Sequence, residues 1–202
     1  MSTTDPQAST RRPMRADARR NYDRLVAVAN AAFAEHGPDA SLDEIARRAG
    51  VGIGTLYRHF PSRQALLEAV YRDQMEALSA EAEALLDAPS PGDALATWLR
   101  SVLAHNMTQR GLKEALMNGE GLVEAVSSAK AQMRAAGAAL VARAQQAGAI
   151  RPDLDIGDLL RLIYGIALAN EKAPESSVDA NRCLLIMIEG LRRQKSTESV
   201  VE

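Results

Sequence analysis

The chain has 202 residues, which is long enough for one large domain or for a small domain joined to a medium one. Its 47% hydrophobic content supports a buried core, while 3% aromatic residues and abundant Ala, Leu, Arg and Glu favour helices over strands. A single cysteine excludes an intrachain disulfide framework, and no apolar run is long enough for a membrane span or signal core, so we expect a soluble, cytoplasmic protein.

The net charge of −2 is unevenly distributed along the chain. Residues 11–63 contain ten Arg against six acidic residues, a net charge of +4, which leaves −6 for the rest. A basic N-terminal part on an acidic body directs that part towards phosphate. Taken alone the asymmetry is a modest signal, because basic helix faces are often simply solvated.

The first predicted elements are a tail and an amphipathic helix. Residues 1–14 are expected to form a flexible basic tail. From Arg15 to about Glu35 the apolar residues recur at spacings of three and four, which predicts one helical face made of Tyr22, Leu25, Val26, Ala29 and Phe33. The segment His36-Gly37-Pro38 then ends the helix, because Gly favours a C-cap and Pro cannot continue it.

Three further helices are predicted up to residue 86. Ser41 and Glu44 have the spacing of a capping box, in which each side chain binds the backbone N–H of the other residue. This short helix ends at Gly50. A third helix begins near residues 52–54 and runs to Phe60, and a fourth, long helix runs from Ser62 to about Leu86.

The second and third of these helices have the spacing of a helix-turn-helix. Ala46 is small enough for the next helix to cross close above it, and Gly50 can adopt the left-handed conformation of a tight turn. Val51 and Leu56 would hold the two helices together. Such a pair presents its second helix to the DNA major groove, although an ordinary helical hairpin has the same spacing.

Residues 41–63, SLDEIARRAGVGIGTLYRHFPSR, followed by Leu66-Leu67, resemble the DNA-binding signature of the TetR family of bacterial transcriptional regulators. The preceding helix ending in His36-Gly37 also fits. The close resemblance covers roughly residues 15–70, and the rest matches only in helical layout. The resemblance implies a regulator, by family habit a repressor, that binds double-stranded operator DNA.

The resemblance also implies roles for individual residues. Ser41, at a helix N-terminus, would bind a phosphate. Arg58 would read a base, with a solvated Arg as the alternative. Arg63 stands where the family usually has Lys and would clamp a phosphate. The remaining candidate DNA contacts are Gly52, Ile53 and Gly54 at the helix tip, and Thr55, Tyr57 and His59, of which Thr55 and His59 look exposed and Tyr57 is alternatively part of the core.

The basic residues at and before the start of the first helix leave two possibilities open. Arg11, Arg12 and Arg15 would follow the adjacent minor groove as an arm, or belong to a disordered tail.

The second half of the chain predicts another set of helices. Ser90 and Pro91 mark a helix start after a linker, followed by an apolar stripe from Leu95 to Met107. A helix rich in Ala and Gly, which allows close approach of its neighbours, spans about residues 128–147. Asp155 is expected to cap a helix at residues 159–169, and residues 180–193 form the last helix before a polar tail.

No catalytic, metal-binding or cofactor-binding pattern is recognisable in this half, since the three His are scattered without ligand spacing. The family uses such a domain to hold a small-molecule effector in a cavity between helices. The candidate lining residues are Trp98, His105, Met107, Met117 and Tyr164, with Asn106 as an alternative polar contact. The alternative for each is that it simply fills the core.

The last two helices carry more apolar surface than one domain can cover, which predicts a homodimer with a four-helix interface. The candidate interface residues are Leu160, Ile163, Ala167, Leu184, Leu185 and Ile188.

The expected protein is therefore all-α, with a flexible tail (1–14), a helix-turn-helix domain (15–61), a connecting helix (62–86), a ligand-binding and dimerisation domain (87–194) and a polar tail (195–202). The alternative functions are a helical small-molecule-binding dimer that has weak or lost DNA binding, and an enzyme with a helical active site.

Overall fold

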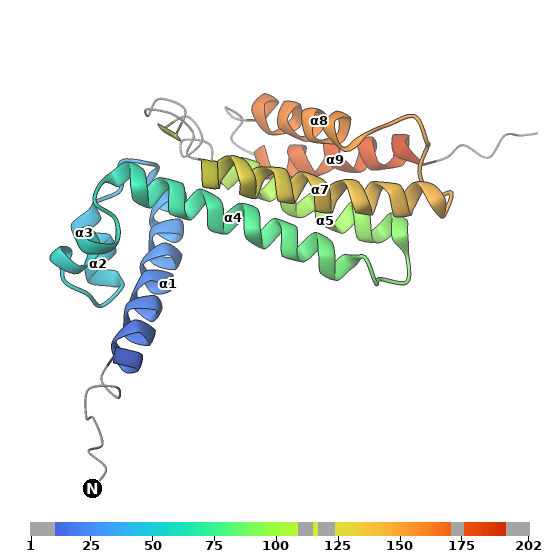
Figure 1. The fold of residues 1–202 in the computed structure, drawn as a ribbon. Helices are drawn as coiled ribbons and strands as arrows, with labels where there is room; N and C mark the ends of the chain where they lie inside the picture. Colours follow the sequence, from blue (N-terminus) through green and yellow to red (C-terminus); the bar gives the residue numbers. More distant parts are fainter. Residues whose placement is uncertain (1–10, 109–114, 117–123, 171–175, 193–202) are drawn as a thin grey trace, which may run out of the picture. The chain divides into compact units, whose positions relative to one another are not determined.

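The computed structural model describes residues 11–108, 115–116, 124–170 and 176–192 (Figure 1). Regular structure within these ranges is helical, and the one strand-like feature among them is an isolated antiparallel bridge between Ile150 and Arg192. The all-α fold class is thus confirmed. The chain divides into two compact units, the first made of residues 1–73 and 109–126 and the second of residues 74–108 and 127–202.

The first unit contains α1 (Arg11–His36), α2 (Leu42–Arg48), α3 (Ile53–His59) and the beginning of α4 (Arg63–Leu85). Helix α1 starts four residues earlier than the sequence predicts, so residues 11–14 are not a tail. Pro13 does not prevent this start, because the N–H groups of a first helical turn have no partner within the helix. Gly37, at φ +75°, ends α1 as predicted, and its N–H donates to the Phe33 carbonyl over 2.9 Å.

One face of each of these helices is buried in a common core. The predicted apolar face of α1 is confirmed at Leu25, Val26, Ala29 and Phe33, which are buried, while Tyr22 is half-buried at the edge. The residues that enter this core are Leu42, Ile45 and Ala46 from α2, Leu56 from α3, and Leu66, Leu67 and Val70 from α4. The core therefore fixes which faces of α2 and α3 remain outside.

The second unit contains the end of α4 with α5 (Pro91–Thr108), most of α7 (Glu124–Gln146), α8 (Ile156–Ala169) and α9 (Ser176–Leu191). Pro91 begins α5 as predicted, and Asp155 caps α8 through a reciprocal pair with Asp158, with N–O distances of 2.9 and 3.0 Å. Helices α7, α8 and α9 each start three or four residues before their predicted positions. Helix α8 packs against α5 and α9, and α5 also contacts α9 (Figure 1).

The indole of Trp98 lies at the centre of the second unit. It is fully buried, and its Nε1–H donates to the Leu78 carbonyl over 2.9 Å. Helix α7 presents Gly137 to this ring so closely that an added Cβ would overlap Trp98. The predicted close approach to the Ala- and Gly-rich helix is thus confirmed at Gly137.

Candidate functional site

The turn between α2 and α3 has the geometry that the helix-turn-helix spacing predicts. Gly50 has φ +68°, a left-handed conformation that residues with a Cβ rarely adopt, and the Val51 N–H donates to the Ala46 carbonyl over 3.0 Å. Ala46 is buried, as the close crossing requires. A guanidinium nitrogen of Arg24, from α1, donates to the Ala49 carbonyl over 3.3 Å, so α1 braces the turn.

Helix α3 has one anchored side and one exposed side. Leu56 is fully buried, Phe60 just after the helix is also buried, and Val51 and Ile53 pack partly against the same core. Tyr57 and Arg58 lie on the exposed side, and neither makes a hydrogen bond or ion pair with a described residue. With 49% of its surface exposed, Tyr57 is not a core residue.

Thr55 and His59 are half-buried, so the expectation that both are exposed is wrong. The reason at His59 is an aromatic cluster: its ring lies 6.1 Å from Tyr22, edge to face, and 6.2 Å from Phe60. Tyr22 in turn packs on Phe60 at 4.9 Å, and its hydroxyl accepts a hydrogen bond of 2.5 Å from Arg72 of α4. Helices α1 and α4 thereby hold the end of α3 in place.

The predicted capping box at Ser41 is only half formed. The Ser41 hydroxyl accepts from the Glu44 N–H over 3.3 Å, but the Glu44 carboxylate accepts from Arg47 and Arg48 over 2.8–2.9 Å. Charged guanidinium donors bind a carboxylate more strongly than a backbone N–H does. These hydrogen bonds, from Arg48 first, lower the pKa of the Glu44 carboxyl, and the bond from Arg48 likewise lowers the pKa of Glu35.

This network changes which arginines are available for DNA. Arg48 pairs with both Glu35 and Glu44, and Arg47 pairs with Glu44. Much of the positive charge of α2 is therefore compensated locally. The predicted base-reading residue Arg58 carries no such compensation among the described residues.

Arg63, the predicted phosphate clamp, is half-buried at the start of α4. Its Nη1 donates to the carbonyls of Pro38 and Ala40 over 2.8 and 2.7 Å. One nitrogen of the guanidinium thus holds the segment between α1 and α2, which is a structural role that the sequence did not indicate.

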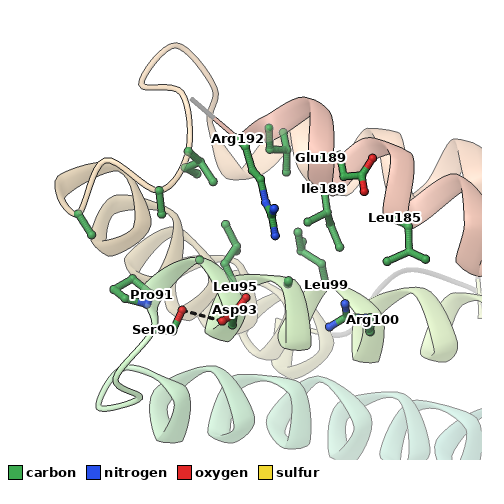
Figure 2. A pocket seen from close by; sticks show the side chains of 16 residues that line it. Ser90, Pro91, Asp93, Leu95, Leu99, Arg100, Leu185, Ile188, Glu189 and Arg192 are labelled. Carbon is green, nitrogen blue, oxygen red and sulfur yellow. Dashed lines mark hydrogen bonds between the residues drawn. The ribbon is translucent and has the colours of Figure 1, made fainter. Parts of the chain in front are cut away.

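The candidate effector residues are not brought together around one described cavity. Trp98 fills the core, His105 and Met107 are half-buried in the last turns of α5, and Tyr164 is exposed on α8. Met117 lies outside the described residues. A cavity of about 450 Å³ opens instead beside the first half of α5, the turn after α7 and the end of α9 (Figure 2).

The candidate dimer residues do not share one exposed face. Ile163, Ala167 and Leu184 are buried within the unit, because the sides of α8 and α9 that carry them pack against their neighbours in the same chain. Leu160 is half-buried, and Leu185 and Ile188 line the cavity of Figure 2. Of the six candidates, Leu185 is also exposed. The other large hydrophobic residues exposed in the described parts of these two helices are Leu162, Tyr164, Leu168 and Ile186.

The described residues offer neither a metal site nor a membrane-spanning helix. No three side chains of His, Cys, Asp or Glu gather there as a metal site would require. None of the helices in the described ranges combines the length and apolar character needed to cross a membrane. A braced helix-turn-helix with an exposed second helix, followed by a helical unit, defines a helix-turn-helix transcriptional regulator.

Comparison with known proteins identifies the family. Residues 25–70 match the model described as bacterial regulatory proteins of the tetR family, and residues 90–193 match the SbtR-like transcriptional regulator C-terminal domain. A TetR regulatory protein from Mycobacterium vanbaalenii is 38% identical, with a TM-score of 0.72 over 90% of this chain and 100% of that chain. A TetR regulator from Streptomyces coelicolor is 35% identical, with a TM-score of 0.74 over 86% and 99%. The chain therefore belongs to the TetR family of bacterial transcriptional regulators.

A curated relative, an HTH-type transcriptional regulator from Staphylococcus aureus strain USA300, is 38% identical over 64 residues. The match spans 31% of this chain and only 35% of the relative. This likeness covers about a third of the relative's length.

Proposed function

We propose that this protein is a repressor that binds a palindromic operator as a homodimer and releases it when a small molecule enters the C-terminal unit. The observation that carries the DNA-binding part is the arrangement of α3. Leu56 anchors the helix in the core, while Tyr57 and Arg58 stand outside without partners among the described residues. A rigid helix with a free guanidinium suits the major groove.

The α3 residues divide into a base reader and backbone contacts. Arg58 reads a guanine, because its guanidinium is exposed and free to bind two acceptors of one base edge. Tyr57, Thr55 and His59 contact phosphates. Nothing lies within 4 Å of a Cβ added at Gly52 or Gly54, so both positions leave room for the DNA backbone to approach.

Two residues outside α3 complete the proposed interface. Ser41 is exposed at the start of α2, where its hydroxyl can serve a phosphate. Arg63 keeps part of its guanidinium for a phosphate while one nitrogen holds the Pro38 and Ala40 carbonyls. Its role is thus both to bind DNA and to position the segment before α2.

The homodimer is proposed to form through the outer sides of α8 and α9. Leu162, Leu168 and Ile186 are exposed there, with about half or more of each side chain accessible. Gly165 and Gly190 add open positions at which a partner helix can approach closely. Two pairs of helices would form a four-helix interface with twofold symmetry, which matches a palindromic operator.

Release of DNA is proposed to follow from effector binding in the second unit. Helix α4 begins in the first unit and ends in the second, so it is the covalent lever between them. An effector that binds better to the DNA-incompetent state lowers operator affinity by the ratio of its affinities for the two states. The coupling is reciprocal, so saturating operator must weaken effector binding by the same factor.

A gel shift with the DNA upstream of the protein's own gene tests the proposal. We expect a specific complex whose affinity falls steeply as salt rises, because phosphate contacts release counterions. Absence of any complex at low salt, in a protein that is folded and dimeric, would favour the alternative of a helical small-molecule-binding dimer that has lost DNA binding.

A further inference from the structure

The cavity in the second unit is built from parts of three segments. Its apolar wall comes mainly from Leu95 and Leu99 of α5, Ile150 of the turn after α7, and Ile188 of α9. Its volume of about 450 Å³ lies within the range of small-molecule sites in proteins. None of the five candidate effector residues is among its lining residues, so it is distinct from the site that the sequence predicts.

One end of this cavity is held closed by backbone contacts. Ile150 and Arg192 form the isolated antiparallel bridge, and the Arg151 N–H donates to the Leu191 carbonyl over 2.9 Å. At the same end, a Cβ added at Gly92 would lie 3.1 Å from the Ala149 Cβ. These contacts hold the backbone from which the Arg192 side chain projects.

The charged side chains that line the cavity are not equivalent. Figure 2 shows the side chain of Arg192, the residue directly after α9, reaching between Leu95 and Ile188, whereas the carboxylate of Glu189 points away from that guanidinium. The Asp93 carboxylate accepts a hydrogen bond of 2.8 Å from the Ser90 hydroxyl. No hydrogen bond or ion pair joins Arg192 to a side chain in the described parts of the protein. Arg100 also lines the cavity. Arg192 is exposed at the cavity, and among the described residues it is a cation without a side-chain partner that projects beside the apolar side chains.

We propose that this cavity binds a small monocarboxylate with an apolar body. The carboxylate accepts two hydrogen bonds from the Arg192 guanidinium, whose planar fork matches its geometry. The apolar body packs against Leu95, Leu99, Ile150 and Ile188. Only the regulatory consequence of this binding rests on the proposed function, because occupancy can be measured without DNA.

Isothermal titration calorimetry of the full chain with sodium octanoate, octan-1-ol and octylammonium chloride tests the site. We expect saturable binding of one octanoate per chain, with weaker binding of the alcohol and the ammonium compound. Tighter binding of octylammonium would assign the recognition to the carboxylates and contradict the proposal. Lack of saturable octanoate binding would also overturn it.

Two variants and one control locate the binding. Arg192→Gln should weaken the binding of octanoate roughly tenfold or more, with little effect on the binding of octanol. Leu185→Trp, which fills the cavity from α9, should weaken both probes. Arg182→Gln is the control, because it removes an exposed guanidinium of α9 that does not line the cavity. It should change the binding of neither octanoate nor octanol.

Circular dichroism checks that each variant remains helical. Octanoate binding unchanged in Arg192→Gln or in Leu185→Trp would place the ligand elsewhere. If octanoate binds as expected and the gel shift fails, only the proposed DNA function is wrong.

Discussion

In α3, Leu56 and Arg58 have separate roles: Leu56 anchors the helix in the core, and Arg58 is exposed with no partner among the described residues. Leu56 sets the orientation of α3 because it is fully enclosed by the core of the first unit. Arg58 is exposed, and it is not drawn into the network in which Glu35 and Glu44 hold Arg47 and Arg48. Charge alone does not distinguish these arginines; their partners do.

Arg58→Ala should lower affinity for the operator by about 1–3 kcal/mol and relax the preference at one base pair in each half-site. Binding to random DNA should change much less, because a base contact adds little there. Arg63→Ala is the matched variant: it should weaken all sequences evenly and also reduce stability, since the Pro38 and Ala40 carbonyls lose their donor. Fluorescence anisotropy with operator DNA and with random DNA measures these affinities. If Arg58→Ala lowered the affinity for both DNAs equally, Arg58 would contact the DNA backbone and not a base.

The carboxylate of Glu44 should contribute to stability in a pH-dependent way. Its pKa is lowered from 4.5 by Arg48 and Arg47, so its contribution is present above that value and is lost as the pH falls through the lowered value. Glu44→Gln should therefore be less stable than the wild type at about pH 7, and the difference should shrink as the pH falls below 4.5. Urea unfolding measures the difference. Asp39→Asn, an exposed carboxylate without an ion pair among the described residues, serves as the control, and a Glu44 effect independent of pH would contradict the assignment.

At the scale of helices, the sequence predicted individual capping and turn residues better than the exact starts of the helices or the segments that each helix packs against. Gly37, Gly50, Pro91 and Asp155 act as predicted, because capping and turn formation depend on residues close in the chain. The half-formed box at Ser41 differs because Arg47 and Arg48 compete for the Glu44 side chain. The earlier start of α1 reflects the tolerance of a first helical turn for Pro13.

Which apolar side chains face a neighbour in the same chain, a cavity or solvent could not be predicted in the same way. Ile163 and Leu184 have the spacing of an interface, yet they pack inside the unit, while Leu185 lines a cavity. Helical periodicity identifies the apolar face of a helix but does not say what covers that face, since the covering segment lies far away in the sequence. The cavity itself combines residues near 95, 150 and 190 and has no local signal.

The packing of α5 on α7 gives a prediction at this scale. Gly137→Ala should destabilise the protein by about 1–3 kcal/mol, because the added Cβ overlaps Trp98 in a filled core. In the Trp98→Phe background the same substitution should cost less, since the smaller ring leaves space. Thermal unfolding of the wild type, Gly137→Ala, Trp98→Phe and the double variant measures the coupling between the two positions. Additive effects would show that the Cβ and the indole do not compete for one space.

At the scale of the whole molecule, the proposed function requires two chains that assemble with twofold symmetry. Ile186→Asp places a charge on the outer side of α9 and should yield monomers that bind operator poorly, because one half-site alone is weak. Leu185→Asp, the adjacent residue, lines the cavity and should leave the dimer intact. Sedimentation velocity distinguishes the two outcomes. Monomers from Leu185→Asp together with dimers from Ile186→Asp would move the interface to the cavity side of α9.

The central claim, that the protein reads a palindromic operator through two copies of α3, is tested most directly by footprinting on its upstream DNA. We expect two protected half-sites related by symmetry, with centres about one helical turn of DNA apart or somewhat more. Protection of both should be lost together in Arg58→Ala. A single asymmetric protected site, or protection that Arg58→Ala leaves unchanged, would contradict the account.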